Sequence, residues 1–249
     1  PQITDQPGVE TTPSLTPDGK SVLYAKTIGA DSALYLLRIG ARAPVRLSGP
    51  APASDSQPAL SPDGERIAFR SERGAGGIYT IAATGGIARL VAPGGRRPEW
   101  SPDGTSLLYE SSRPDGQNEL FTVPVQGGEP VHVFQDLTPH IRQAHATWRP
   151  DGQVSMYGLH DTGGWSFWTA AKPAQASTKV EISSDVRQRL SDAQLTLSEF
   201  AWSPDLMHLY FRGTSNKGDA LWRIDVDPQT SRWVGGPVRV ISVDGLNSG

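Results

Sequence analysis

Short runs with the spacing of β-strands cover most of the chain. Arg66–Arg70 reads Arg-Ile-Ala-Phe-Arg, and its large apolar residues Ile67 and Phe69 lie two positions apart, which predicts a strand. Similar short runs follow at Ile78–Ile81 and Leu120–Val123, and glycine pairs such as Gly85-Gly86 separate the runs as turns do. No apolar repeat of 3.5 or 3.6 residues is sustained along the chain. The pattern therefore predicts an all-β protein.

A proline-aspartate turn recurs along these strands. The tetrapeptide Ser-Pro-Asp-Gly, or a close variant, occurs five times, and its aspartates lie 45, 40, 48 and 54 residues apart. Proline fixes φ, aspartate can bond its own backbone, and glycine accepts positive φ, so each copy predicts a tight turn. A repeat of roughly 40 residues is typical of one four-stranded propeller blade. Five aspartates are each expected to hold their own turn: Asp18, Asp63, Asp103, Asp151 and Asp205.

The predicted fold is a β-propeller of four-stranded blades in a single domain, 1–249, with five blades visible in this chain. The blades are expected at about 13–48, 58–92, 98–134, 146–183 and 200–242.

Residues 1–5 align with an outer strand that has no blade of its own in this chain. Our hypothesis is that they close a sixth blade, so that the chain is an arc of a six-bladed parent. A closed five-bladed ring is the alternative. Because the sequence starts at Pro1, we expect a piece of a longer protein, and a targeting signal can lie outside it.

Composition narrows the range of partners. The chain has 249 residues, 23 basic and 26 acidic, with a net charge of −3 and no block of like charge. This balance argues against nucleic acid or an anionic membrane as the main partner. No apolar run reaches the roughly 18 residues that span a bilayer. The absence of cysteine excludes disulfides and thiolate chemistry.

The repeat resembles the TolB-like propellers, a WD-repeat-like group built from the Ser/Arg/Thr-Pro-Asp-Gly motif, and the resemblance covers about residues 1–243. It implies a bacterial propeller that serves as a periplasmic translocation component, as a sensor or scaffold domain beside kinases and regulators, or as a domain ahead of a prolyl-oligopeptidase-like hydrolase. Leu221–Pro228 looks most like the multidomain signalling branch. An extracytoplasmic, periplasmic location is the expectation that follows.

The fourth repeat departs from the others. A long insert follows it, and Asp185–Leu195 places Val186 and Leu190 on one helical face, with Asp185 as the expected N-cap. We interpret 184–197 as a short helix or ordered loop between blades, which serves either as a surface decoration or as a docking element for a partner.

The tryptophans fall into two groups. Trp100, Trp148 and Trp202 share one position of the repeat with Leu15 and Leu60, and the three tryptophans are expected to pack between blades. Gly235-Gly236 is interpreted as the last hairpin turn, and Trp233 beside it is expected to be exposed.

The innermost strand of each propeller blade faces the central channel, so residues entering that strand are candidates for a binding mouth. In contrast to the repeated core, these residues differ from blade to blade, as a specific binding surface requires. Solvated loops that are polar without a function are the alternative interpretation. The candidates are Thr12, Gln57, Arg96, Arg97, His145 and Glu199, the two arginines suiting a carboxylate or phosphate.

Catalytic and metal-binding signatures are not found in the sequence. There is no Gly-x-Ser-x-Gly elbow and no phosphate-binding glycine loop. His140, His145 and His160 lack the spacing of a compact ligand set, so no metal and no cofactor are expected. The favoured function is a non-catalytic sensor or binding module for a protein or peptide. A propeller that gates an adjacent hydrolase, and a TolB-like translocation component, are the alternatives.

Overall fold

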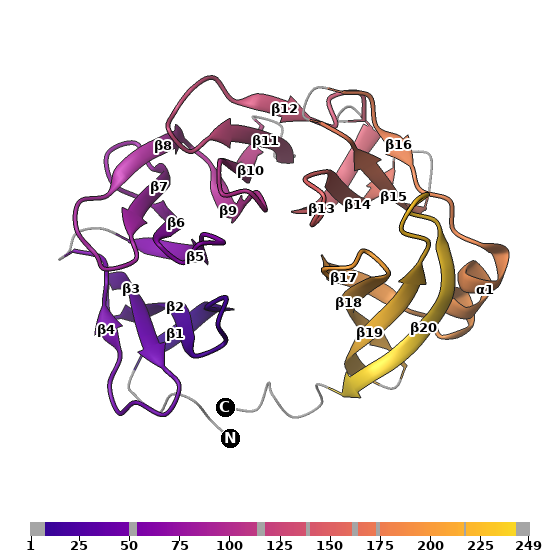
Figure 1. The fold of residues 1–249 in the computed structure, drawn as a ribbon, viewed down its shortest axis with the longest axis horizontal. Coiled ribbons are helices and arrows are strands. Elements are labelled where there is room, and N and C mark those ends of the chain that lie inside the picture. Colours follow the sequence, from indigo (N-terminus) through magenta and orange to yellow (C-terminus); the bar gives the residue numbers. More distant parts are fainter. Residues whose placement is uncertain are drawn as a thin grey trace. The chain divides into compact units, whose positions relative to one another are not determined.

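The computed structural model describes residues 8–49, 54–113, 118–137, 140–160, 164–172, 175–216 and 218–242. Within these ranges it holds five antiparallel four-stranded sheets and one helix, so the predicted all-β propeller fold with five blades is confirmed (Figure 1). Contacts along the chain divide it into two compact units, Pro1–Val133 and Phe134–Gly249, and each unit is described by itself. The expected outer strand at 1–5 lies outside the described residues.

The first unit contains three sheets, in each of which consecutive strands are neighbours. Their strands are β1 (Val9–Leu15), β2 (Ser21–Ile28), β3 (Asp31–Arg38) and β4 (Val45–Arg46); β5 (Asp55–Leu60), β6 (Arg66–Ser71), β7 (Gly77–Ala82) and β8 (Arg89–Pro93); β9 (Arg96–Trp100), β10 (Ser106–Ser112), β11 (Asn118–Pro124) and β12 (Val131–Val133).

The second unit contains two sheets of the same topology and the helix between them in sequence. Its elements are β13 (Ile141–Trp148), β14 (Val154–His160), β15 (Trp165–Ala170) and β16 (Thr178–Lys179); α1 (Ser184–Asp192); β17 (Thr196–Trp202), β18 (His208–Ser215), β19 (Gly218–Val226) and β20 (Trp233–Ser242).

The Ser-Pro-Asp-Gly motif forms the turn between the first two strands of each sheet. The Ser61 hydroxyl donates to Asp63 Oδ1 at 2.5 Å and accepts the backbone N–H of Arg66 at 2.9 Å. Asp63 Oδ1 also accepts the backbone N–H of Glu65 at 3.0 Å. One serine therefore joins the aspartate to the start of the next strand. The same pair of bonds recurs at Thr16, Ser101 and Ser203.

These bonds stabilise the charged form of the turn carboxylates. The hydrogen bond from Ser61 is the largest cause of the lowered pKa of Asp63, and the backbone N–H of Glu65 is the next. The pKa values of three more turn aspartates are lowered in the same way, each first by its own hydroxyl partner: Asp18 by Thr16, Asp103 by Ser101 and Asp205 by Ser203.

The prolines that precede these turns lie inside the first strands, not at their beginnings. β5 starts at Asp55 and β9 at Arg96, two or three residues earlier than the predicted blade limits at 58 and 98. Proline cannot donate to a sheet, but a first strand is an edge strand, and Pro58 and Pro98 each lie where the pairing register shifts. The bulge lets the strand pair on both sides of its proline.

Apolar side chains pack between neighbouring sheets of each unit. In the first unit, Leu23 and Phe69 belong to a buried cluster shared by the first two sheets. Ile78 and Leu107 belong to one shared by the next two sheets. Trp100, 6% exposed, packs in this second cluster as predicted. Trp148 and Trp202 are half-buried, whereas Leu15, at the aligned position of the first sheet, is exposed.

The packed tryptophans also link neighbouring sheets through polar contacts. Trp100 Nε1 donates to the carbonyl of Ala59 at 2.9 Å, while the guanidinium of Arg66 lies 4.8 Å from the Trp100 ring. In the second unit, the guanidinium of Arg149 lies 4.6 Å from the Trp202 ring. Each arginine comes from the preceding sheet, so the cation–π contact holds two sheets together.

The expected exposure of Trp233 is wrong. Trp233 is 1% exposed and packs against Phe167, with ring centroids 5.2 Å apart. The turn lies earlier than predicted, because Asp227 accepts the backbone N–H of Gln229 at 2.9 Å and so closes the chain there. Gly235-Gly236 instead falls inside β20, whose pairing with β19 is irregular at this point.

The insert of the fourth repeat is the helix α1, as predicted, with Ser183 rather than Asp185 as its N-cap. Ser183 accepts the backbone N–H of Val186, and Val186 is buried in the same cluster as Trp233. Asp185 lies in the first turn, where its charge favours the helix N-terminus. The helix therefore covers β20 and completes the core of the second unit.

We expect Asp103→Ala to lower the Tm by about 2–4 °C at pH 7, the shift for one typical hydrogen bond lost from a chain of this size. The folded chain keeps Asp103 deprotonated to lower pH than the unfolded chain does. Its stabilisation is therefore present above the ordinary pKa and is lost as the pH falls below about 4. Thermal melts from pH 7 to about pH 3 should show the two Tm values converging. Exposed Glu129, replaced by alanine, is the control, and a gap that stays constant with pH would contradict the account.

Trp233→Ala should destabilise the second unit by about 3–5 kcal/mol, because it removes a large side chain from a closed core. Trp233→Phe keeps most of the packing and should cost clearly less. Urea titration followed by tryptophan fluorescence and circular dichroism measures both effects. Equal and small effects of the two variants would mean that Trp233 is not packed in the core.

Candidate functional site

The first strands of the three sheets in the first unit lie side by side: β1 contacts β5, and β5 contacts β9 (Figure 1). Each is an edge strand that pairs on one side only, so it presents unpaired backbone groups on the other. They form one continuous surface of edge strands in this unit, which we call the first-strand surface.

Three candidate residues adopt the same unusual backbone conformation on this surface. Thr12, Gln57 and Arg97 have φ values of 51°, 53° and 50°, in the left-handed region that non-glycine residues rarely occupy. Each lies at the bulge of its strand, immediately before the proline. A bulge redirects the side chain that it carries. A strained conformation held at three equivalent positions is a reason to look for function there.

A polar network joins four of the side chains on β5, β9 and β10. The backbone N–H of Arg97 donates to Gln57 Oε1 at 2.8 Å, which ties the bulges of two sheets together. Arg96 Nε donates to Glu110 Oε2 at 3.2 Å, and Arg97 Nη1 donates to Glu110 Oε1 at 3.3 Å. Glu110 is buried, 5% exposed, so its charge is held between the two guanidinium groups.

A second arginine contact fixes the entry to β9. Arg70 Nη1 donates to the carbonyl of Gly95 at 2.8 Å, and the same guanidinium binds Glu72 through Nε at 2.9 Å and Nη2 at 2.8 Å. Gly95 is required here, since a Cβ atom would lie 2.5 Å from the ring of Tyr109. The backbone that carries Arg96 and Arg97 is therefore anchored on both sides.

The structure brings Gln57, Arg96 and Arg97 into one network. Thr12 shares their conformation on the adjacent strand β1. Three further residues of the network were not predicted from the sequence: Glu110 on β10, Arg70 on β6 and Asn118 on β11. Nothing in the sequence distinguished Glu110, because its strand reads Ser-Leu-Leu-Tyr-Glu-Ser-Ser and contains other polar residues.

In the second unit, His145 and Glu199 also lie on first strands, and β13 contacts β17. The His145 ring meets Phe200 edge to face, with centroids 5.3 Å apart. His145 pairs regularly with Tyr157, because Ala146 replaces proline and can keep its place in the ladder. Glu199 is exposed at a bulge and helps to raise the pKa of Arg212, after the larger effect of the hydrogen bond to Asp219.

Two further findings concern the described residues. No group of three His, Asp or Glu side chains gathers there as metal ligands would. No helix among them is long and apolar enough to cross a membrane. The side chain of His160 lies outside the described part.

A scan against protein-family models matched residues 1–206 to the TolB beta propeller domain. The chain belongs to this family. The match covers all five copies of the turn motif, through Leu206, and these are the motifs that carried the predicted resemblance. No curated protein sequence matched.

Solved structures share this fold at low sequence identity. A TolB-type protein from Agrobacterium tumefaciens is 20% identical, with a TM-score of 0.68, and the match covers 91% of this chain and 80% of that one. TolB from Acinetobacter baumannii is 16% identical, with a TM-score of 0.65, over 89% and 53% of the two chains. Prolyl oligopeptidase B from Galerina marginata is 13% identical, with a TM-score of 0.55, over 95% and 44%. At these identities the likeness shows the fold alone.

Thr12→Asn should raise the Tm by about 1–3 °C, because asparagine tolerates the left-handed conformation better than a β-branched residue does. Thr11→Asn is the matched control, since Thr11 is also exposed and is not among the residues with positive φ. Differential scanning calorimetry measures both. If the two variants shift the Tm equally, the proposed strain at the bulge is absent.

Proposed function

We propose that this chain is a non-catalytic module of a larger bacterial protein, which binds a protein or peptide through its first-strand surface. The observation that carries the proposal is the repeated bulge: three neighbouring edge strands hold three different polar residues, Thr12, Gln57 and Arg97, in one strained conformation. A constant backbone that displays variable side chains is how repeat proteins build specific binding surfaces.

The edge strands suit a peptide ligand for a second reason. Unpaired backbone N–H and C=O groups can bond an extended peptide, while side chains at the bulges read its sequence. His145 and Glu199 lie on the first strands of the second unit. Their side chains are proposed to contact a peptide in the same way. The network around Glu110 holds Arg96 and Arg97 in place before a ligand arrives, which lowers the entropic cost of binding.

We assign the module to an extracytoplasmic, periplasmic setting, in keeping with the TolB-like resemblance. Its partner is a protein or peptide rather than nucleic acid, because the net charge is −3. No cofactor, metal or membrane insertion is part of the proposal. A role as a TolB-like translocation component is one form of the same binding function.

A propeller that gates a hydrolase is the second candidate, favoured by the likeness to the prolyl oligopeptidase B fold. It demands a nucleophile-elbow domain in the same parent protein. In that case this chain alone shows no turnover of peptide substrates, and binding at the first-strand surface serves to admit or position a substrate.

The test is selection of random peptides displayed on phage against the immobilised chain. Peptides that use the first-strand surface should bind the double variant Arg96→Ala, Arg97→Ala at least about tenfold more weakly, as expected when charged contacts at an interface are removed. Thermal melts establish that the variant remains folded.

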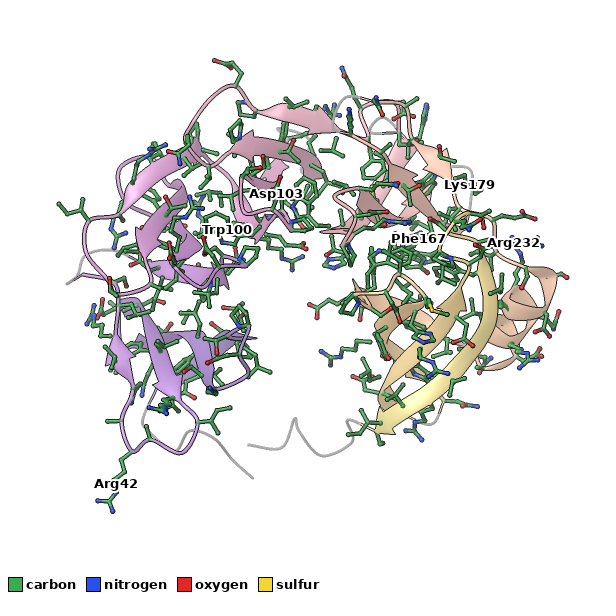
Figure 2. The ribbon with its side chains drawn as sticks, viewed as in Figure 1. Arg42, Trp100, Asp103, Phe167, Lys179 and Arg232 are labelled. Atoms are coloured by element: carbon green, nitrogen blue, oxygen red, sulfur yellow. The ribbon has the colours of Figure 1, made fainter. Side chains whose placement is uncertain are left out.

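Arg42→Ala is the matched control. Arg42 is exposed on the loop after β3 and extends away from the sheets of its unit, whereas Trp100 and Asp103 mark the sheet that carries Arg97 (Figure 2). Binding should be unchanged in this variant. If no peptide is selected, or if the double variant binds every selected peptide as the parent does, the proposed function is wrong.

A further inference from the structure

We infer that the ligand group bound at Arg97 is a singly charged carboxylate of an acidic peptide, and that Glu110 sets this preference for one negative charge. The inference rests on the proposed function and specifies the chemistry of the same surface. Two observations support it: the guanidinium donors of Arg96 and Arg97 that are already hydrogen-bonded, and the net charge of these two arginines together with Glu110.

The two arginines differ in what they can offer. Arg96 uses Nε on Glu110 and Nη2 on Asn118, the latter at 2.5 Å, and its side chain is 39% exposed. Arg97 uses only Nη1, and its side chain is 59% exposed. Among the described residues, Nε and Nη2 of Arg97 have no acceptor, so its side-on pair of donors is free, whereas only Nη1 of Arg96 is unoccupied.

Free donors on a guanidinium suit a carboxylate. Planar guanidinium and carboxylate groups form two parallel hydrogen bonds, usually at about 2.7–2.9 Å. The existing contact of Arg97 with Glu110 is a single bond of 3.3 Å, longer than that range. Because this bond uses only Nη1, a peptide carboxylate can bind Nε and Nη2 of Arg97 without displacing Glu110.

The local charge favours one negative charge over two. Arg96 and Arg97 carry two positive charges, and the buried Glu110 carboxylate cancels one of them, since both of its oxygens bind an arginine. One positive charge remains. A carboxylate neutralises it, whereas a phosphate dianion leaves a negative charge beside buried Glu110. Glu110 is therefore the residue that determines specificity, and it acts through the arginines.

The experiment uses the full chain, labelled so that the Arg97 Nε–Hε signal is resolved by NMR. It is titrated with three capped tripeptides, acetyl-Gly-X-Gly-amide, in which X is aspartate, asparagine or phosphoserine. The aspartate peptide should shift the Arg97 signal with millimolar affinity, the asparagine peptide should leave it in place, and the phosphoserine peptide should bind no more tightly than the aspartate peptide.

The variant Glu110→Gln keeps the size of the side chain but raises the local charge by one. It should improve binding of the phosphoserine peptide over the aspartate peptide by about three- to tenfold, as expected for one added charge at a partly solvated site. Arg97→Lys keeps the positive charge but lacks the planar guanidinium, so it should weaken binding of the aspartate peptide. Arg42→Gln is the control and should change neither affinity.

Three results would overturn the inference: equal shifts with aspartate and asparagine, preference of the parent chain for phosphoserine, or an unchanged ratio in Glu110→Gln. Because Arg97→Lys tests the fork separately, the inference stays testable if Glu110→Gln fails to fold. The selected peptides can also separate the two proposals. If their binding needs Arg96 and Arg97 but they carry no acidic group, the proposed function stands and the inference of a carboxylate ligand is wrong. Failure to select any peptide would refute both.

Discussion

The fold depends on one hydrogen-bonded turn that recurs along the chain. In each copy with serine or threonine, the hydroxyl binds the aspartate and accepts the first N–H of the next strand, so the first two strands of a sheet are set at a fixed distance and direction. In the fourth copy Arg149 replaces serine, and its guanidinium binds Asp151 at 2.9 Å. The Arg149 guanidinium also stacks on the Trp202 ring, so this turn contacts the next sheet as well.

The turn also explains why the first strands can carry variable residues. The closing hydrogen bonds lie at one end of each first strand, and the bulge before proline lies in its middle. Between them, β5 and β9 recover normal pairing at Ala59 and Glu99. Residues at the bulge therefore contribute little to holding the sheet, and they are free to differ between repeats. Because Gln57 is not needed for pairing within its own sheet, its side chain can accept the backbone N–H of Arg97 and so join two sheets.

The sequence predicted the sheets well because turn and strand signals are local. It failed where two local signals competed: Gly235-Gly236 looked like a hairpin turn, but the Asp227-Pro228 turn comes first and leaves the glycines and Trp233 within β20. A shared repeat position does not fix burial, because Leu15 is exposed where the aligned Trp100 is buried. The grouping of Gln57, Arg96 and Arg97 followed from the repeat. Glu110 could not be found from sequence, because its role depends on cross-strand pairing with Arg96.

In the function that we propose, a rigid repeated backbone presents a polar first-strand surface to a peptide. Amide hydrogen exchange of the full chain, with and without a selected peptide, tests it most directly. The account predicts added protection in β1, β5 and β9 around the three bulges, and no change in the outer strands β4, β8 and β12. Protection confined to the outer strands, with the first strands unchanged, would contradict it.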